Sequence, residues 1–420
     1  MAKPRENEID WTIPSERLPR RGPGGRLSLL AGVRVLDLTT SLAGPYATLL
    51  LADLGADVIK IERPGIGDDS RGWRPPELAG KALWFSSVNR NKRSLTLDYS
   101  KDEGRSVLFD LVRRCDVLLT NQLPNVQAKL GVSYDVLKAI KPDLVFVSLT
   151  GFGIDGVRAD RPCYDLIAEG YSGVMDLTGE ANSDPQKVGT PAADLLGGAD
   201  AALGCLAALF DRAATGKGHL VDVALVDSMT RFMTPRLVSF LGGGDLPRRT
   251  GAKDSVIAIY QVFHTADEPI TLGLANDNIW ARFCRAVERT DLLEDRGLSD
   301  NAGRVRERSR LVAEITALLR RESRQHWLDL FAREGVPAGP INRLDEVASD
   351  PELHRRGLFY AMDDCGAPLP QVGLGIRFDG ADAGYDHLPP DLGQHTEEIL
   401  INMLGYPPGR VADLRGKGLI

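Results

Sequence analysis

The feature that most constrains the fold is a regular alternation of strand-like and helix-like patterns across residues 33–149. Short runs rich in valine, isoleucine and leucine predict buried strands at residues 33–38, 57–61, 94–97, 117–120 and 144–149. Amphipathic segments between these runs predict helices at residues 45–54, 101–114 and 134–140. Strands that alternate with helices in this way form parallel sheets covered by helices. We therefore expect an α/β protein built on a doubly wound, Rossmann-like parallel sheet.

A second, smaller domain is expected after a break in this pattern. A long helix at 194–215, a strand at 220–224 and a helix at 227–241 continue the α/β pattern up to a glycine cluster with proline at 242–247. Beyond the cluster, the patterns predict strands at 258–263 and 270–274 and helices at 278–287, 305–320 and 324–334. The 420 residues are thus divided into an exposed N-terminal arm (1–26), a large α/β domain (27–241), a linker with a small α+β domain (242–345) and a C-terminal segment (346–420). In that last segment, only residues 395–404 have a clear helical pattern.

The composition limits the kinds of molecule that this chain is expected to bind. The formal net charge is -7, which argues against general binding to nucleic acid, and no apolar run approaches a bilayer span. The five cysteines are scattered without a CxxC pair, so we expect reduced thiols and a cytoplasmic location. The six histidines lack HxxxH or HExxH spacing, and no metal site is expected.

Polar side chains that follow the predicted strands indicate where a ligand would bind. In open α/β sheets, ligands bind at the carboxyl ends of the strands, which here lead into residues 39–44, 62–65 and 120–122. Neither GxGxxG after the first strand nor GxxxxGK[ST] is present, which disfavours ordinary dinucleotide and P-loop binding. The cationic stretch at 89–93 has two interpretations, phosphate contacts or a solvated loop.

Asp194 is the most informative single residue, because it is an acid among small and apolar neighbours at 190–199. One interpretation is a carboxylate nucleophile or base, with Gly197 and Gly198 allowing a backbone or a substrate to approach closely. The other is an N-cap or first-turn acid that stabilises the helix at 194–215. The residue pattern alone leaves both open.

The chain resembles the class III CoA-transferases, the family that includes formyl-CoA transferase and carnitine CoA-transferase and is related to α-methylacyl-CoA racemase. The resemblance spans roughly residues 30–405. It is carried by the segments LAGVRVLD (30–37), AGP (43–45), ADLGADVIKIERP (52–64), NKRSL (91–95), SLTGFG (148–153), AAD (192–194), TGKG (215–218) and GVPAGP (335–340). Asp194 matches the catalytic aspartate of this family, so the resemblance favours the nucleophile.

The resemblance implies a mechanism that needs no ATP. The carboxylate of Asp194 would attack a donor acyl-CoA to form an anhydride, and returning CoA would convert this to an aspartyl-CoA thioester. A carboxylic acid acceptor would then form a second anhydride, which CoA resolves into the new acyl-CoA. Acyl-CoA is therefore a substrate, and no tightly bound cofactor is expected. Partial desolvation would make Asp194 more reactive, and backbone N–H groups could stabilise oxyanions.

The resemblance also assigns residues to the CoA site by position. Leu42 and Ala43 would line the entrance, Arg63 would meet the CoA nucleotide, and Leu97 would pack near adenine. The remaining implied contacts to CoA are Asn121, Gln122, Lys129, Tyr164 and Asp165. From the residues alone, Lys129 is equally a solvated helix lysine and Asp165 a structural acid.

Departures from the family pattern bear on the reaction. Residues 253–260 lack the glycine run of formyl-CoA transferase, which disfavours oxalate–formate exchange. Racemases of the family carry a histidine where this chain has Tyr164, so racemisation lacks one of its two bases. The alternatives to a transferase are an α-methylacyl-CoA racemase or epimerase and a non-catalytic CoA-binding protein. The resemblance further implies an interlocked homodimer, with the C-terminal segment returning to the large domain.

Overall fold

A six-stranded parallel sheet forms the centre of the protein. The computed structural model describes residues 14–364 and 367–420. The sheet consists of β2 (Arg34–Asp37), β3 (Asp57–Glu62), β6 (Lys92–Thr96), β7 (Val117–Thr120), β8 (Val145–Thr150) and β9 (His219–Ala224). Its spatial order is β6-β3-β2-β7-β8-β9, and every neighbouring pair is parallel. The expected parallel α/β sheet is confirmed, and the strand order reverses between β2 and β7, where such sheets bind ligands.

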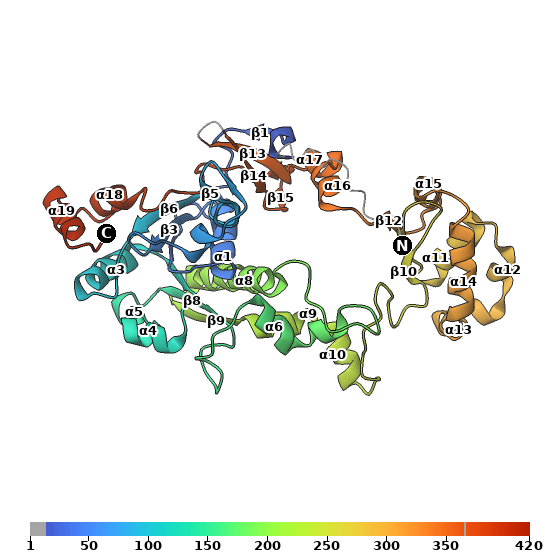
Figure 1. Cartoon of the computed structure of the whole chain (residues 1–420). Helices are drawn as coiled ribbons and strands as arrows, with labels where there is room; N and C mark the ends of the chain where they lie inside the picture. The colour runs from blue at the N-terminus through green and yellow to red at the C-terminus, as the bar shows by residue number, and fades with distance from the viewer. Residues whose placement is uncertain (1–13, 365–366) are drawn as a thin grey trace. The chain divides into compact units, whose positions relative to one another are not determined.

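Helices cover the sheet. Helix α1 (Ala43–Asp53) packs against the long helix α8 (Ala192–Thr215), which also contacts β8 and β9 (Figure 1). A buried apolar core joins the sheet to α3 (Asp102–Arg114) and α5 (Tyr134–Ile140). The sequence pattern missed α4 (Pro124–Leu130) and α6 (Asp165–Ser172), which have only seven and eight residues. Short helices have too few turns to show a clear period.

The helix expected at 227–241 is two helices, α9 (Leu225–Phe232) and α10 (Thr234–Leu241). Proline has no N–H to donate and its ring clashes with the preceding turn, so Pro235 accounts for the break after Met233. The helix expected at 305–320 is likewise interrupted at Glu307, between α13 (Asn301–Arg306) and α14 (Arg308–Leu319).

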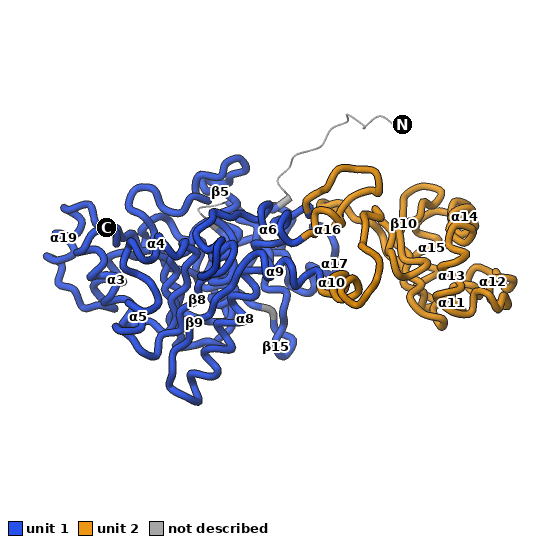
Figure 2. Tube along the Cα trace, turned by 90° about the horizontal axis from the view of Figure 1, so that it is seen from below, with its two compact units in different colours: residues 1–172, 188–233, 348–420 blue, residues 173–187, 234–347 orange. Residues whose placement is uncertain are grey.

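The chain divides into two compact units (Figure 2). Unit 1 comprises residues 1–172, 188–233 and 348–420, and unit 2 comprises 173–187 and 234–347. Residues 173–187, which the sequence pattern left in the large domain, belong to unit 2. The Gly251 N–H donates to the Gly179 carbonyl, and Arg249 donates to the carbonyl and carboxylate of Asp176.

The C-terminal segment packs on the sheet of unit 1. Its strands β13 (Phe359–Asp364) and β14 (Ala367–Val372) pair antiparallel, a hairpin that the sequence pattern did not predict. Strand β1 (Arg20–Arg21) pairs with β13, so residues 20–21 of the expected exposed arm are paired through their backbone. Further on come α18 (Thr396–Glu398), a π-helical turn (Ile399–Met403) and α19 (Pro408–Gly416), whose apolar side chains join the core of the sheet.

Unit 2 has its own core. A small antiparallel sheet of β10 (Tyr260–Phe263), β11 (Ile270–Gly273) and β12 (Ala338–Pro340) packs with α11 (Asp277–Ala286), α14 and α15 (Arg324–Glu334). Aromatic side chains fill the space between these elements, with Phe283 and Phe331 fully buried.

One helix among the described residues, α8, is long and apolar enough to cross a membrane by length and composition. Its Gly197 and Gly198 are buried against neighbouring elements of unit 1, as in the core helix of an α/β protein. The described cysteines, Cys115, Cys163, Cys205 and Cys284, are free, and Cys365 lies outside the described residues. No group of three or more potential metal ligands occurs in the described part of the chain.

Candidate active site

Asp194 lies in the first turn of α8 but does not cap the helix. Helix α8 begins at Ala192, and its N-cap residue, Pro191, offers no side-chain hydrogen bond. The capping group is Asp165, whose Oδ1 accepts the N–H groups of Ala193 at 2.8 Å and Asp194 at 3.3 Å. The Leu195 N–H bonds to the Pro191 carbonyl. The N-cap interpretation of Asp194 is therefore wrong, although its place in the first turn still suits an acid that stabilises the helix. The amides of 193–195 are already engaged and make poor oxyanion donors.

The surroundings of Asp194 disfavour its charge. Burial raises the pKa of the Asp194 carboxyl from its usual value to about 7, and the nearby negative charge of Asp165 adds to this rise. Burial and then the charge of Asp194 raise the pKa of the neighbouring Cys163 thiol to about 11, so that thiol stays protonated at neutral pH. A desolvated carboxylate is a stronger nucleophile than a hydrated one, as the sequence analysis expected of Asp194.

Gly197 and Gly198 lie where helices pack closely, and at Gly198 it is a backbone that approaches, one of the two possibilities that the sequence left open. A Cβ on Gly198 would lie 2.6 Å from the backbone carbonyl of Ala43, at the start of α1. A Cβ on Gly197 would lie 2.5 Å from the side chain of Leu225. Gly198 thus lets α1 come within backbone contact of α8, one turn after Asp194, and Gly197 makes room for Leu225 of α9.

An apolar cavity of about 330 Å³ adjoins the same turn. Leu42 lines it, together with Pro191 and Leu195, which flank Asp194 in sequence. Ala43 is buried where α1 meets α8. Leu42 and Ala43 therefore lie near the first turns of α8, which contain Asp194.

A second cavity, of about 240 Å³, lies at the carboxyl ends of β2, β3 and β7, where the strand order reverses. It brings together three of the implied CoA contacts, Arg63, Asn121 and Gln122. Arg63 is exposed and pairs with the exposed Asp69 at 2.6 Å. Gln122 donates to the Tyr99 hydroxyl, and its buried Oε1 has no hydrogen-bond partner among the described residues. The cavity thus offers a cation and a free acceptor to a ligand.

The other implied contacts lie apart from this cavity. Leu97 is buried in the apolar core of the sheet. Lys129 is exposed on α4, and Tyr164 is exposed just before α6. Asp165 acts on Asp194 through the helix start and through its charge.

The cationic stretch at 89–93 neither faces phosphate nor forms a solvated loop. Arg90 is buried and makes a bidentate ion pair with Asp53. Lys92 is fully buried, and its Nζ donates to the Pro45 carbonyl, Asn89 Oδ1 and Asp37 Oδ2. Burial lowers the pKa of Lys92 to about 7, although the charge of Asp37 opposes this shift. Both interpretations from sequence were wrong for these two side chains, because they pair inside unit 1.

Sequence reasoning also missed three buried charged residues under the second cavity, namely Asp37, Lys60 and Asp68. The Lys60 Nζ pairs with Asp68 Oδ2 at 2.8 Å, and both side chains are fully buried. Lys60 holds the pKa of the Asp68 carboxyl near 2, well below its usual value, even though burial acts in the opposite direction. A charged residue within an apolar strand pattern, as in DVIKIE (57–62), was the available signal.

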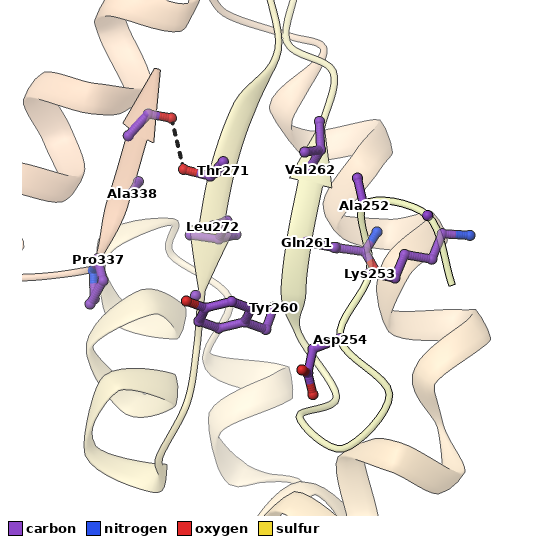
Figure 3. A pocket seen from close by; sticks show the side chains of 13 residues that line it. Ala252, Lys253, Asp254, Tyr260, Gln261, Val262, Thr271, Leu272, Pro337 and Ala338 are labelled. Carbon is purple, nitrogen blue, oxygen red and sulfur yellow. Dashed lines mark hydrogen bonds between the residues drawn. The ribbon is translucent and has the colours of Figure 1, made fainter. Parts of the chain in front are cut away.

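Unit 2 contains a separate cavity of about 600 Å³ on its small sheet (Figure 3). Residues 251–254 and Tyr260 line it, so it involves the stretch that lacks the glycine run. Figure 3 shows the Tyr260 ring lying toward β11. A Cβ on Gly273 would approach that ring to 3.0 Å, so the glycine makes room for it.

Known proteins are similar to this chain in sequence and in fold. A model of CoA-transferase family III matches residues 30–396. The succinyl-CoA:glutarate CoA-transferase of Mus musculus is 36% identical over 392 residues, which cover 93% of this chain and 90% of that protein. The succinyl-CoA:mesaconate CoA-transferase of Haloarcula hispanica is 36% identical over 386 residues, which cover 89% of this chain and 96% of that protein.

The crystal structure of a CaiB/BaiF family protein from Brucella suis is also similar. It superposes with a TM-score of 0.77 at 37% identity and covers 89% of this chain and 99% of that one. These similarities span nearly the whole chain and confirm the resemblance seen in the sequence. The chain belongs to CoA-transferase family III and is an enzyme that transfers CoA.

Proposed function

We propose that the enzyme moves CoA from succinyl-CoA to a dicarboxylic acid through covalent intermediates on Asp194, in a homodimer. The relatives from mouse and Haloarcula are named for a succinyl-CoA donor and for glutarate and mesaconate as acceptors. The observation that carries the proposal is a desolvated carboxylate in the first turn of α8 that caps nothing.

The reaction proceeds by four substitutions at carbonyl carbon. The Asp194 carboxylate attacks the thioester carbonyl of the donor, which forms a mixed anhydride and expels CoA thiolate. The thiolate attacks the aspartyl carbonyl, which gives the Asp194–CoA thioester and releases the donor acid. The acceptor carboxylate attacks this thioester, forms a second anhydride and again expels the thiolate. The thiolate then attacks the acceptor carbonyl, which yields the new acyl-CoA and restores Asp194.

The nucleotide end of CoA occupies the cavity at the reversal of strand order. Arg63 can exchange its solvent-exposed partner Asp69 for a phosphate, because both side chains are more than half exposed. Gln122 Oε1 can accept a hydrogen bond from an amino group of the ligand. Lys129, on α4, supplies a further positive charge outside the cavity.

The homodimer is supported by an apolar stripe on α8. Leu203 and Phe210 are 64% and 84% exposed on this helix, which is more apolar surface than a solvated helix normally presents. A second copy of the chain would cover it, in line with the interlocked arrangement that the resemblance implies. Analytical ultracentrifugation should give twice the chain mass, and Phe210→Glu should weaken association. A monomeric wild-type protein would remove this part of the proposal.

Peptide mass spectrometry tests the mechanism. The enzyme is incubated with succinyl-CoA and other thioesters, with and without hydroxylamine. We expect CoA or hydroxamate mass on the peptide that contains Asp194, and none in Asp194→Ala. If Asp194 stays unmodified while the substrate α-proton exchanges with deuterated water, the enzyme is a racemase and the proposal fails.

A further inference from the structure

Side chains hold the backbone of residues 39–41 at five of its six polar atoms, and three of these five hydrogen bonds involve buried charged residues. Asp37 Oδ1 accepts the Thr39 N–H at 2.9 Å, and Lys60 Nζ donates to the Thr39 carbonyl at 2.8 Å. Asp68 Oδ1 accepts the Ser41 N–H at 3.0 Å.

Asn121 fixes the middle residue of this loop from across the reversal of strand order. Its Oδ1 accepts the Thr40 N–H at 3.2 Å, and its Nδ2 donates to the Thr40 carbonyl at 2.9 Å. Both polar atoms of the side chain are therefore engaged with backbone. Asn121 is better suited to hold the loop than to grip a ligand directly.

The loop needs this support because its backbone is strained. Ser41 has φ of 72°, in the left-handed region that a residue with a side chain rarely adopts. Such a conformation persists only where surrounding contacts over-determine it.

The loop connects the two parts of the site. Thr40 lines the cavity at the strand reversal, and Leu42 lines the apolar cavity next to Pro191 and Leu195. Ala43 follows at once, and its carbonyl touches α8 at Gly198, one turn after Asp194. A shift of residues 39–41 would thus displace the wall of one cavity and the start of α1 against the catalytic helix.

We infer that the buried Lys60–Asp68 pair and Asn121 are positioning residues for CoA transfer, which act by fixing residues 39–41 between the CoA cavity and the catalytic turn. This inference rests on the proposed role of Asp194. Misplacing a catalytic element by about 1 Å can cost on the order of a hundredfold in rate.

The test compares Asp68→Asn with Asp116→Asn. Asp116 accepts hydrogen bonds from Arg34 N–H and Arg212 at the amino edge of the same sheet, so the control also breaks a semi-buried ion pair but leaves the loop intact. The measurement is the single-turnover rate of covalent labelling of Asp194 by succinyl-CoA, with thermal unfolding of each variant. We expect Asp68→Asn to slow labelling about ten- to a hundredfold and Asp116→Asn to leave the rate unchanged, with both variants folded at the temperature of the assay.

Asn121→Ala provides a second variant, because Asn121 is only half-buried and its loss should leave the protein folded. It should slow labelling in the same direction. Equal rates for wild type, Asn121→Ala and Asp68→Asn would overturn the inference while the proposed function stands. Absence of labelling at Asp194 in the wild type would instead overturn the proposed function.

Discussion

Two carboxylates in unit 1, the buried Asp68 and the half-buried Asp194, have opposite electrostatic surroundings. Asp68, below the strand reversal, faces Lys60, which holds its pKa near 2 despite burial. Asp194, at the start of α8, has a carboxylate neighbour, and burial with that charge raises its pKa to about 7. Burial raises the pKa of both carboxyls and is the main cause at Asp194, whereas at Asp68 the charge of Lys60, with hydrogen bonds from Lys60 and Ser70, outweighs it. A partnered acid supports the fold, whereas an acid beside another acid is available for reaction.

The largest effect on activity is expected from removal of the Asp194 carboxylate. Asp194→Ala should lower transfer activity by at least about a thousandfold, because the nucleophile is removed. The variant should remain folded, since the lost carboxylate caps nothing. Activity assays with circular dichroism check both points, and transfer at near wild-type rate would show that Asp194 is not the nucleophile.

Breaking the buried Lys60–Asp68 ion pair should lower the stability of the protein. Lys60→Met leaves the buried Asp68 charge without its partner, which should lower the free energy of unfolding by about 3–5 kcal/mol. Urea unfolding at pH 7 measures this loss. A variant that also replaces Asp68 with Asn should recover part of the stability, and no recovery would show that charge pairing is not the cause.

Asp194 also predicts a pH dependence. Only the ionised carboxylate attacks a thioester, so the labelling rate of Asp194 should fall about tenfold per pH unit below about pH 7. Ionisation of Asp68 stabilises the folded protein, whereas ionisation of Asp194 destabilises it, so the two residues change stability in opposite directions as pH rises. A raised folded pKa means that the penalty of ionising Asp194 is absent below the unfolded pKa near 3.8 and grows as pH rises toward about 7.

The variant Asp165→Asn tests how much the charge of Asp165 contributes to the raised pKa of Asp194. The amide oxygen can still accept the N–H groups of Ala193 and Asp194, but the like charge is gone. The pH profile of labelling should therefore move to lower pH. A profile that does not move would mean that burial alone sets the pKa of Asp194.

The smallest effect concerns an exposed pair. Asp69→Asn frees Arg63 for phosphate and should tighten CoA binding only about two- to fivefold, because exposed ion pairs contribute about 0–1 kcal/mol. Calorimetric titration with CoA measures it, with Asp102→Asn as the control for loss of one exposed negative charge. Weaker binding in Asp69→Asn would contradict the placement of phosphate at Arg63.

The sequence predicted the parts of the molecule that have clear local signals. All six strands of the parallel sheet were expected close to their observed bounds, because each is a short apolar run between helical segments. The hairpin of β13 and β14 was missed, since its strands contain polar and proline residues in place of an apolar run. Strand β13 also pairs with Arg20 and Arg21, which lie far away in sequence.

The roles of some residues in the candidate site could be predicted from the sequence, and those of others could not. The resemblance assigns Asp194 as the nucleophile, which stays a prediction, and Arg63, Asn121 and Gln122 do line one cavity. The roles of Gly197, Gly198 and Arg90 could not be derived, because they depend on what lies opposite each residue in space. Distant packing partners such as Ala43 for Gly198 and Asp53 for Arg90 leave no local pattern in the sequence.

The negative charge that Asp165 places beside Asp194 has a consequence for the whole catalytic cycle. On the proposed mechanism, both anhydrides and the CoA thioester make Asp194 electrically neutral, as protonation does. The repulsion that raises the pKa of the free carboxylate is therefore absent in every covalent intermediate. Asp165 therefore raises the free energy of the resting enzyme relative to its acylated forms, which favours the first substitution, in which the Asp194 carboxylate loses its charge.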